Sequence, residues 1–259
     1  MSDVPSSHPR YLSLKLRDAI VTGVEKGITS AHGLIAHGRG EAFDYLVGEE
    51  TQAFAEAAIR SAAAMLLRAS HPVISVNGNA AALVPAELVS LGAACDAPLE
   101  VNIFHASKER ETAIEKELRD NGAPRVLLPL AGATLDHIDS NRRYVNPEGI
   151  AAADVVFVPL EDGDRCEALR KAGVEVVTID LNPLSRTARL ASVTIVDNVV
   201  RAMPLLIDAV GTLKVCDEEE LNGIVSSYDN EAILDEALLR IRHGGGYHPS
   251  PDIRGCFRR

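Results

Sequence analysis

The sequence predicts a protein of the α/β class, built on a mainly parallel β-sheet flanked by helices. From residue 72 onward, short runs of β-branched residues and leucine alternate with segments of helical periodicity, which is typical of βαβ units. The runs are apolar almost throughout, as expected of strands covered on both faces. The six expected strands are Val73–Val76, Leu99–Phe104, Val126–Leu130, Val155–Val158, Val174–Ile179 and Val193–Val196.

Helices are expected before this region, between its strands and after it. In the N-terminal segment Leu12, Leu16, Ile20 and Val24 recur at every fourth position, which places them on one helical face. An alanine-rich segment follows, and alanine favours helix. The expected helices are Tyr11–Lys26, Thr51–Ala69, Ala80–Leu91, Ser107–Asn121, Asp164–Ala172, Val199–Lys214 (with Pro204 as a kink) and Glu231–Arg242.

The chain is expected to form one integrated domain. Residues 1–70 would be a helical segment packed on the core, residues 71–214 the α/β core, and residues 215–243 the C-terminal helices. Residues 131–150 show no clear period and are expected to be a long loop, either a functional flap or a weakly ordered connection. The glycine-rich segment 244–259 is expected to be disordered.

Composition excludes several classes of protein. The 259 residues are 46% hydrophobic and carry 37 acids against 26 bases, a net charge of −11. This balance argues against nonspecific nucleic-acid binding but not against a local basic pocket. The four cysteines form no CxxC pair, so neither a zinc ribbon nor a disulfide framework is expected, and a reducing cytoplasm is. We expect no membrane association, because the chain has neither a signal peptide nor an apolar run that could span a bilayer.

Polar clusters follow four of the expected strands. Ligands bind at the carboxyl ends of the strands in an open parallel sheet, so the four clusters together predict a ligand site. Any one of them alone could be an ordinary turn or helix cap. Asp180 could accept hydrogen bonds from ribose, and Arg186 and Arg189 follow it with geometry suited to phosphate. The clusters are Asn77–Ala80, Pro159–Arg165, Asp180–Thr187 and Asp197–Asn198.

Other local patterns leave alternatives open. Neither GxxxxGK[ST] nor GxGxxG is present, which argues against a Walker-type ATPase. The three carboxylates in Glu161–Asp164 could hold Mg²⁺ through waters or a substrate ammonium, or could simply complement a helix dipole. His37 and Arg39 lie between glycines, which predicts a tight loop close to a ligand. For His37 a purely structural role is the alternative.

Taken together, several of these segments resemble the archaeal phosphopantothenate synthetases, or 4-phosphopantoate–β-alanine ligases. The resemblance runs from about residue 5 to about residue 243. It implies a homodimeric, Rossmann-like, nucleotide-binding enzyme of coenzyme A biosynthesis, which condenses 4-phosphopantoate with β-alanine and converts ATP to AMP and diphosphate. The matching strings are Ser7–Tyr11, Gly33–Leu46, Ser75–Asn79, Val158–Arg165, Asp180–Arg186 and Ile195–Asn198.

The resemblance also implies roles for individual residues. Its ATP contacts fall on Arg17, Arg39, Asp180, Leu181, Asn182, Arg186, Thr187, Asn198 and Val199. As further hypotheses, Asn77, Asn79, Ala80 and His37 contact the acyl substrate, and Glu161 or Asp164 holds Mg²⁺ or the β-alanine ammonium. Arg39 and Arg186 are the expected catalytic arginines, because the first step gathers negative charge.

The sequence leaves three alternative functions open. The first is a nicotinamide-dependent oxidoreductase on the same fold, although the chain lacks GxGxxG. The second is a noncatalytic nucleotide sensor. The third is a ligase with the same chemistry that acts on a different acid, such as unphosphorylated pantoate.

Overall fold

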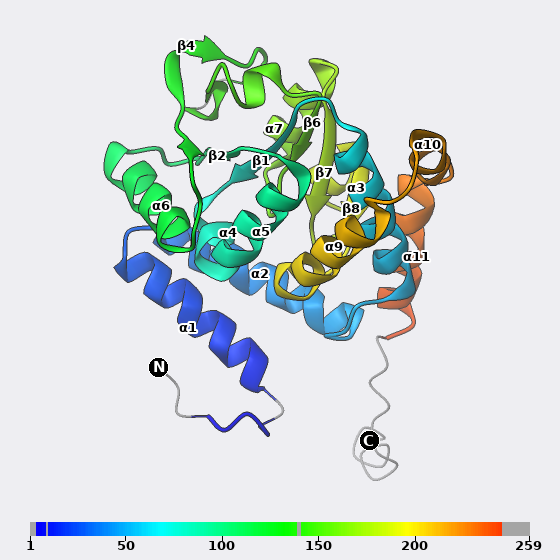
Figure 1. The fold of residues 1–259 in the computed structure, drawn as a ribbon. Helices are drawn as coiled ribbons and strands as arrows, with labels where there is room; N and C mark the ends of the chain where they lie inside the picture. The colour runs from blue at the N-terminus through cyan, green and yellow to red at the C-terminus, as the bar shows by residue number, and fades with distance from the viewer. Residues whose placement is uncertain (1–3, 9, 139–140, 245–259) are drawn as a thin grey trace.

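The structure is a computed structural model that describes residues 4–8, 10–138 and 141–244. At its centre lies a six-stranded parallel sheet with the order β3-β2-β1-β6-β7-β8 (Figure 1). This confirms the predicted fold class. The chain enters at the middle of the sheet, builds out to one edge and then returns to continue beside β1, so the strand order reverses between β1 and β6. The strands are β1 (Pro72–Val76), β2 (Leu99–Val101), β3 (Val126–Leu127), β6 (Val155–Phe157), β7 (Glu175–Ile179) and β8 (Val193–Ile195).

The two faces of the sheet are covered unequally. Neighbouring strand residues point to opposite faces, and Ile74 belongs to the larger apolar cluster whereas Val73 belongs to the smaller one. The larger cluster lies under α3 (Ala53–Arg68), α5 (Pro85–Cys95) and α9 (Val199–Leu213). The smaller cluster lies under α7 (Gly163–Lys171). The runs are apolar on both sides because both faces are covered.

The N-terminal region contains a helix where a loop was expected. The structure confirms helices α1 (Tyr11–Glu25) and α3, but residues 33–44 are not a tight loop, because they belong to α2 (Ala31–Val47). Gly33 allows close packing, because a Cβ there would lie 2.2 Å from Thr29 Oγ1, whereas a Cβ on Gly38 would meet nothing within 4 Å. The helix ends at Gly48, whose φ of 118° is left-handed.

The segment expected to be one long loop forms a small second sheet. β4 (Leu130–Thr134) pairs antiparallel with β5 (Tyr144–Val145), and short 3₁₀ turns lie at Asn141–Arg143 and Ile150–Ala152. In Figure 1 this green segment projects beyond the central sheet. Strands this short, interrupted by a register shift, leave no readable alternation in the sequence.

The remaining helices match expectation with two differences. The expected helix Ala80–Leu91 is two helices, because Pro85 begins a new one after Val84. Two further helices match none of the expected ranges: α8 (Arg186–Leu190) and α10 (Glu218–Ser226), which starts with a capping box between Asp217 and Glu220. The tail from residue 245 onward lies outside the described residues. No helix in the described ranges is long and apolar enough to cross a membrane. The helices not yet given bounds are α4 (Gly78–Leu83), α6 (Lys108–Asp120) and α11 (Asn230–Arg242).

Candidate functional site

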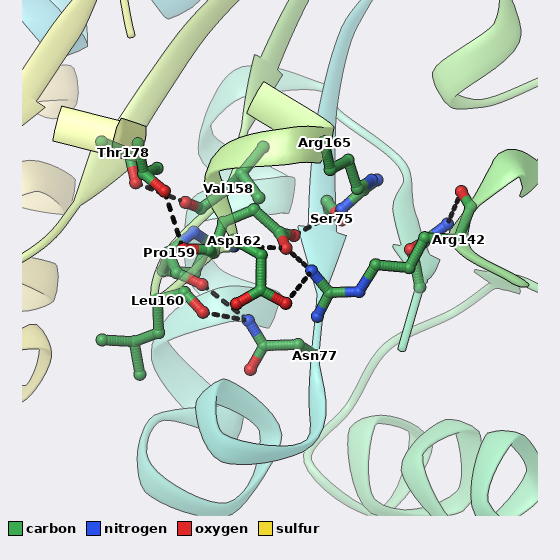
Figure 2. A network of polar contacts seen from close by, with 12 residues as sticks. Ser75, Asn77, Arg142, Val158, Pro159, Leu160, Asp162, Arg165 and Thr178 are labelled. Atoms are coloured by element: carbon green, nitrogen blue, oxygen red, sulfur yellow. Dashed lines mark hydrogen bonds and ion pairs between the residues drawn. The ribbon is translucent and has the colours of Figure 1, made fainter. Parts of the chain in front are cut away.

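The loops that follow β1 and β6 are tied together at the point where the strand order reverses. Asn77 caps α4 by accepting a hydrogen bond from the Ala80 N–H at 3.0 Å. Its Nδ2 donates to the carbonyls of Pro159 at 2.7 Å and Leu160 at 3.2 Å, as Figure 2 shows. The Asn77 side chain is thus engaged by the protein. It fixes the two loops between which a ligand of this fold binds.

Two cavities adjoin at this point. The first, which we call the apolar cavity, has a volume of about 120 Å³. The second, the arginine cavity, measures about 200 Å³. Both are lined in part by Ala36, Asn79 and Leu160, so they share a wall. The apolar cavity includes Leu12, Leu16, His37, Leu83, Leu181, Asn198 and Val199; the arginine cavity includes His32, Arg39, Phe104, His105, Arg110, Arg142 and Asp162.

A buried ionic network fixes α2 against the end of β8. Asn198 Nδ2 donates to Asp44 Oδ2 at 2.7 Å, and Arg201 Nη2 lies 2.6 Å from both Asp44 Oδ1 and Asp197 Oδ1. Thr51 Oγ1 donates to Asp197 Oδ2 at 2.7 Å. Although burial opposes it, the ion pairs with Asp44 and Asp197 raise the pKa of Arg201. The network places Asn198 at the wall of the apolar cavity.

The three arginines expected to bind phosphate lie in different environments. Arg39, on α2, lines the arginine cavity and forms no ion pair in the described part of the chain, although its charge opposes the rise in the pKa of Asp180 that burial causes. Arg17, on α1, is paired with Glu41 at 2.8 Å. Arg186, at the start of α8, is 65% exposed and paired with Glu167. Arg39 is therefore free to bind an anion, whereas Arg17 and Arg186 must first break an ion pair with a carboxylate.

Asp180 and Thr187 shape the loop after β7. The Asp180 carboxylate accepts hydrogen bonds from the Asn182 N–H at 2.9 Å and from Ser185 Oγ at 2.5 Å. Burial raises the pKa of Asp180, and these two hydrogen bonds oppose the shift. Thr187 Oγ1 donates to the Glu161 carbonyl at 2.9 Å. With these side chains engaged, Leu181 is the residue of the loop that faces the apolar cavity.

Glu161 forms the centre of a second buried ionic network. Its carboxylate pairs with Arg165 at 2.7 Å and with Arg142, and it accepts the Asp162 N–H at 2.7 Å. Arg165 is fully buried and donates to Ser75 Oγ at 2.9 Å (Figure 2). Burial lowers the pKa of both arginines to about 10. Asp164 lies in the first turn of α7, where a carboxylate complements the helix dipole.

The residues expected to contact the acyl substrate are spread over core and cavity. His37 lines the apolar cavity, and its buried Nε2 has no partner within the described part of the chain. Burial lowers the pKa of His37. Asn79 faces both cavities, with hydrogen bonds to Thr29 and to the Gly33 carbonyl. The Ala80 side chain is buried in the main core.

Sequence reasoning missed several residues of the arginine cavity and its surroundings. Arg110 comes from α6, and Arg142 comes from the segment interpreted as a loop. Glu100, fully buried in β2, accepts hydrogen bonds from the N–H groups of Asn146 at 2.8 Å and Ile150 at 2.7 Å. A lone glutamate inside an apolar run was the signal available for it.

Comparisons with known proteins agree on one family. The model of the phosphopantothenate/pantothenate synthetase family matches residues 54–244. A 4-phosphopantoate–β-alanine ligase from Thermococcus kodakarensis is 52% identical over 243 residues, which cover 93% of each chain. The protein of the same name from Methanosarcina mazei is 48% identical over 93% of this chain and 95% of its own. That from Methanospirillum hungatei is 45% identical over 92% of this chain and 96% of its own.

Proposed function

The chain belongs to the phosphopantothenate/pantothenate synthetase family, and from this premise we propose that it is an ATP-dependent 4-phosphopantoate–β-alanine ligase. It joins the carboxylate of 4-phosphopantoate to the amine of β-alanine, gives 4′-phosphopantothenate, AMP and diphosphate, and serves coenzyme A biosynthesis. The observation that carries the proposal is 45–52% identity to ligases of that name over nearly the whole chain. The two adjoining cavities at the strand ends support it.

The chemistry requires that the carboxylate be activated, because an amine does not displace oxide from it. Attack of the 4-phosphopantoate carboxylate on the α-phosphate of ATP forms an acyl adenylate and releases diphosphate. The β-alanine amine then attacks the acyl carbon, loses a proton, and AMP leaves. Negative charge accumulates on the phosphates in the first step, so cationic side chains are the expected catalysts.

The two cavities suit the two reacting partners. The apolar cavity, bounded by Leu181 and Val199, would take the adenine end of ATP, and the acyl substrate would lie in the arginine cavity. Their shared wall then brings the α-phosphate next to the carboxylate, which is the proximity the first step needs. Arg39 lines the arginine cavity from α2 and is placed to stabilise the transferring phosphate. Arg17 and Arg186 would exchange Glu41 and Glu167 for phosphate oxygens.

The remaining polar residues differ in how far their side chains are already engaged within the protein. His37 and Asn79 face the cavities and can hydrogen-bond substrate. Magnesium is expected with ATP, but the candidate Glu161 already neutralises two buried arginines, and the described residues contain no cluster of three metal-ligating side chains. The donor set therefore does not fit a protein-held metal, and no step here depends on one. We further propose that the enzyme is cytoplasmic and that it is a homodimer. Light scattering, which measures the mass of the assembly, would test the dimer.

A product assay tests the proposed function. The protein is incubated with ATP, 4-phosphopantoate and β-alanine, and nucleotides are followed by chromatography. The expected result is AMP formed together with 4′-phosphopantothenate. ADP instead of AMP would refute the adenylate route in favour of an acyl phosphate, and binding of ATP without turnover would identify a sensor. Pantoate, tested in parallel, distinguishes the two acids. The oxidoreductase alternative is not favoured, since the curated relatives are named as ligases.

A further inference from the structure

The arginine cavity carries more positive charge than the carboxylates around it neutralise. Arg39, Arg110 and Arg142 line it from α2, α6 and the turn before β5; Arg142 is paired with Glu161 and Asp162, whereas the other two form no ion pair in the described part of the chain. The Asp162 side chain is itself 58% exposed. Guanidinium groups gathered from separate elements repel one another, and a bound anion would offset that repulsion.

Arg110 is anchored by neutral groups alone. Its Nη1 donates to the His105 carbonyl at 2.7 Å and its Nη2 to the Ile28 carbonyl at 3.4 Å. Within the described ranges its buried Nε has no hydrogen-bond partner and no carboxylate pairs with it. A Cβ on Gly78 would lie 3.1 Å from Nη2, so the glycine leaves room for the guanidinium beside the end of β1. Arg110 is thus held in place while its charge remains unpaired.

Arg142 is held in place by the segment that carries it. Asn102 Nδ2 donates to the carbonyls of Arg142 and Tyr144, each at 3.2 Å. The guanidinium lies 5.6 Å from the centre of the Phe104 ring, and the residue is 5% exposed. Its Nε has no hydrogen-bond partner among the described residues. The segment that leads into the small second sheet therefore holds Arg142 at the cavity wall, beside its carboxylate partners Glu161 and Asp162.

We propose, on the basis of the ligase function above, that Arg110 and Arg142 bind the phosphate of the acyl substrate and so select phosphorylated pantoate over pantoate. The planar fork of arginine matches the oxygens of a phosphate monoester. A substrate whose carboxylate lies at the shared wall, next to ATP, directs its other end into the arginine cavity. The same chemistry could also bind a phosphate of ATP, and the experiment distinguishes these two sources.

The test is steady-state kinetics of Arg110→Met with each substrate varied in turn. KM for 4-phosphopantoate should rise at least about tenfold, the usual cost of losing a charged hydrogen bond, while KM for ATP stays within about twofold. Arg143→Met is the matched control, because it removes an exposed arginine next to Arg142, and it should change neither KM. If Arg110→Met does not fold, Arg110→Lys keeps the charge, loses the fork and should raise the same KM less.

Two results would overturn the phosphate site. One is a parallel rise in KM for ATP, which would assign the arginine to the nucleotide. The other is a KM for 4-phosphopantoate that stays within about twofold of the unmodified value, well below the loss expected for a charged contact. Failure of the underlying function is a separate outcome, since the unmodified protein would then form no AMP from the three substrates.

Discussion

Replacement of Glu161 by glutamine should destabilise the fold strongly. Glu161 lies between Arg142 and Arg165, which are 5% and 0% exposed. Glutamine keeps the size of the side chain and removes its charge. Two guanidinium groups that are almost fully buried then lose their shared counter-ion, which is the costly way to break a buried ion pair.

The loss in the free energy of unfolding depends on the contacts that Arg142 and Arg165 keep. Removal of one partner of a buried pair typically costs about 3–5 kcal/mol. Arg142 retains Asp162 Oδ2 at 3.1 Å, and Arg165 retains Ser75 Oγ at 2.9 Å. We therefore expect the lower end, about 3 kcal/mol, which corresponds to a fall in Tm of roughly 6–12 °C for a chain of this size. A carboxylate free to hold a ligand would instead change stability by less than about 0.5 kcal/mol.

Urea unfolding at one fixed protein concentration measures the difference in the free energy of unfolding. Asp162→Asn is the matched control, because it removes the same charge from the next residue, whose side chain is 58% exposed. It should cost less than about 1 kcal/mol. If Glu161→Gln unfolds within about 1 kcal/mol of the unmodified protein, Glu161 does not hold the two arginines, and its role as a ligand for the substrate ammonium becomes the better explanation.

Three further predictions concern α2. Arg39→Ala should lower kcat at least about a hundredfold in the AMP assay, and near-normal turnover would remove Arg39 from the site. Gly33→Ala should lower the free energy of unfolding by about 1–3 kcal/mol, because its Cβ would lie 2.2 Å from Thr29 Oγ1; Gly38→Ala, with nothing within 4 Å, should not. Because burial lowers the pKa of His37, the unfolded chain binds the proton more tightly. Stability should then fall as pH drops below about 6.5, less so in His37→Asn, as urea midpoints would show.

The order of elements could be predicted from the sequence because both faces of the sheet are covered and the strands are apolar. Where strands end could not be predicted in this way. The run Leu99–Phe104 looks like one strand, yet β2 stops at Val101, the partner of the last β1 residue, Val76. Beyond that point no strand pairs with it among the described residues, and the chain turns into the arginine cavity with Phe104. Of the apolar residues there, Ile103 packs in the main core as well as lining the cavity, and Phe104 lines the cavity.

The carboxyl edge of the sheet, beside which the two cavities lie, could also be predicted, but the partners of its side chains could not. Glu100 is 46 residues from Asn146, whose N–H it binds, and Arg142 reaches Glu161 across the sheet. Such pairs depend on how a crossover folds back, which local patterns do not encode. Gly38 and Gly40, on either side of Arg39, predicted a turn, yet both lie inside α2, where glycine is tolerated at a cost in helix stability.

Net charge and local charge act at different ranges here, which reconciles an acidic chain with anionic substrates. The chain carries −11 overall, but exposed charges are screened within roughly 8 Å at physiological salt. Inside the cavity, Arg110 and Arg142 are partly or wholly removed from water, so their interaction with a bound anion is screened far less. The surface acids therefore disfavour the binding of polyanions, and a few buried arginines determine which small anion binds in the cavity.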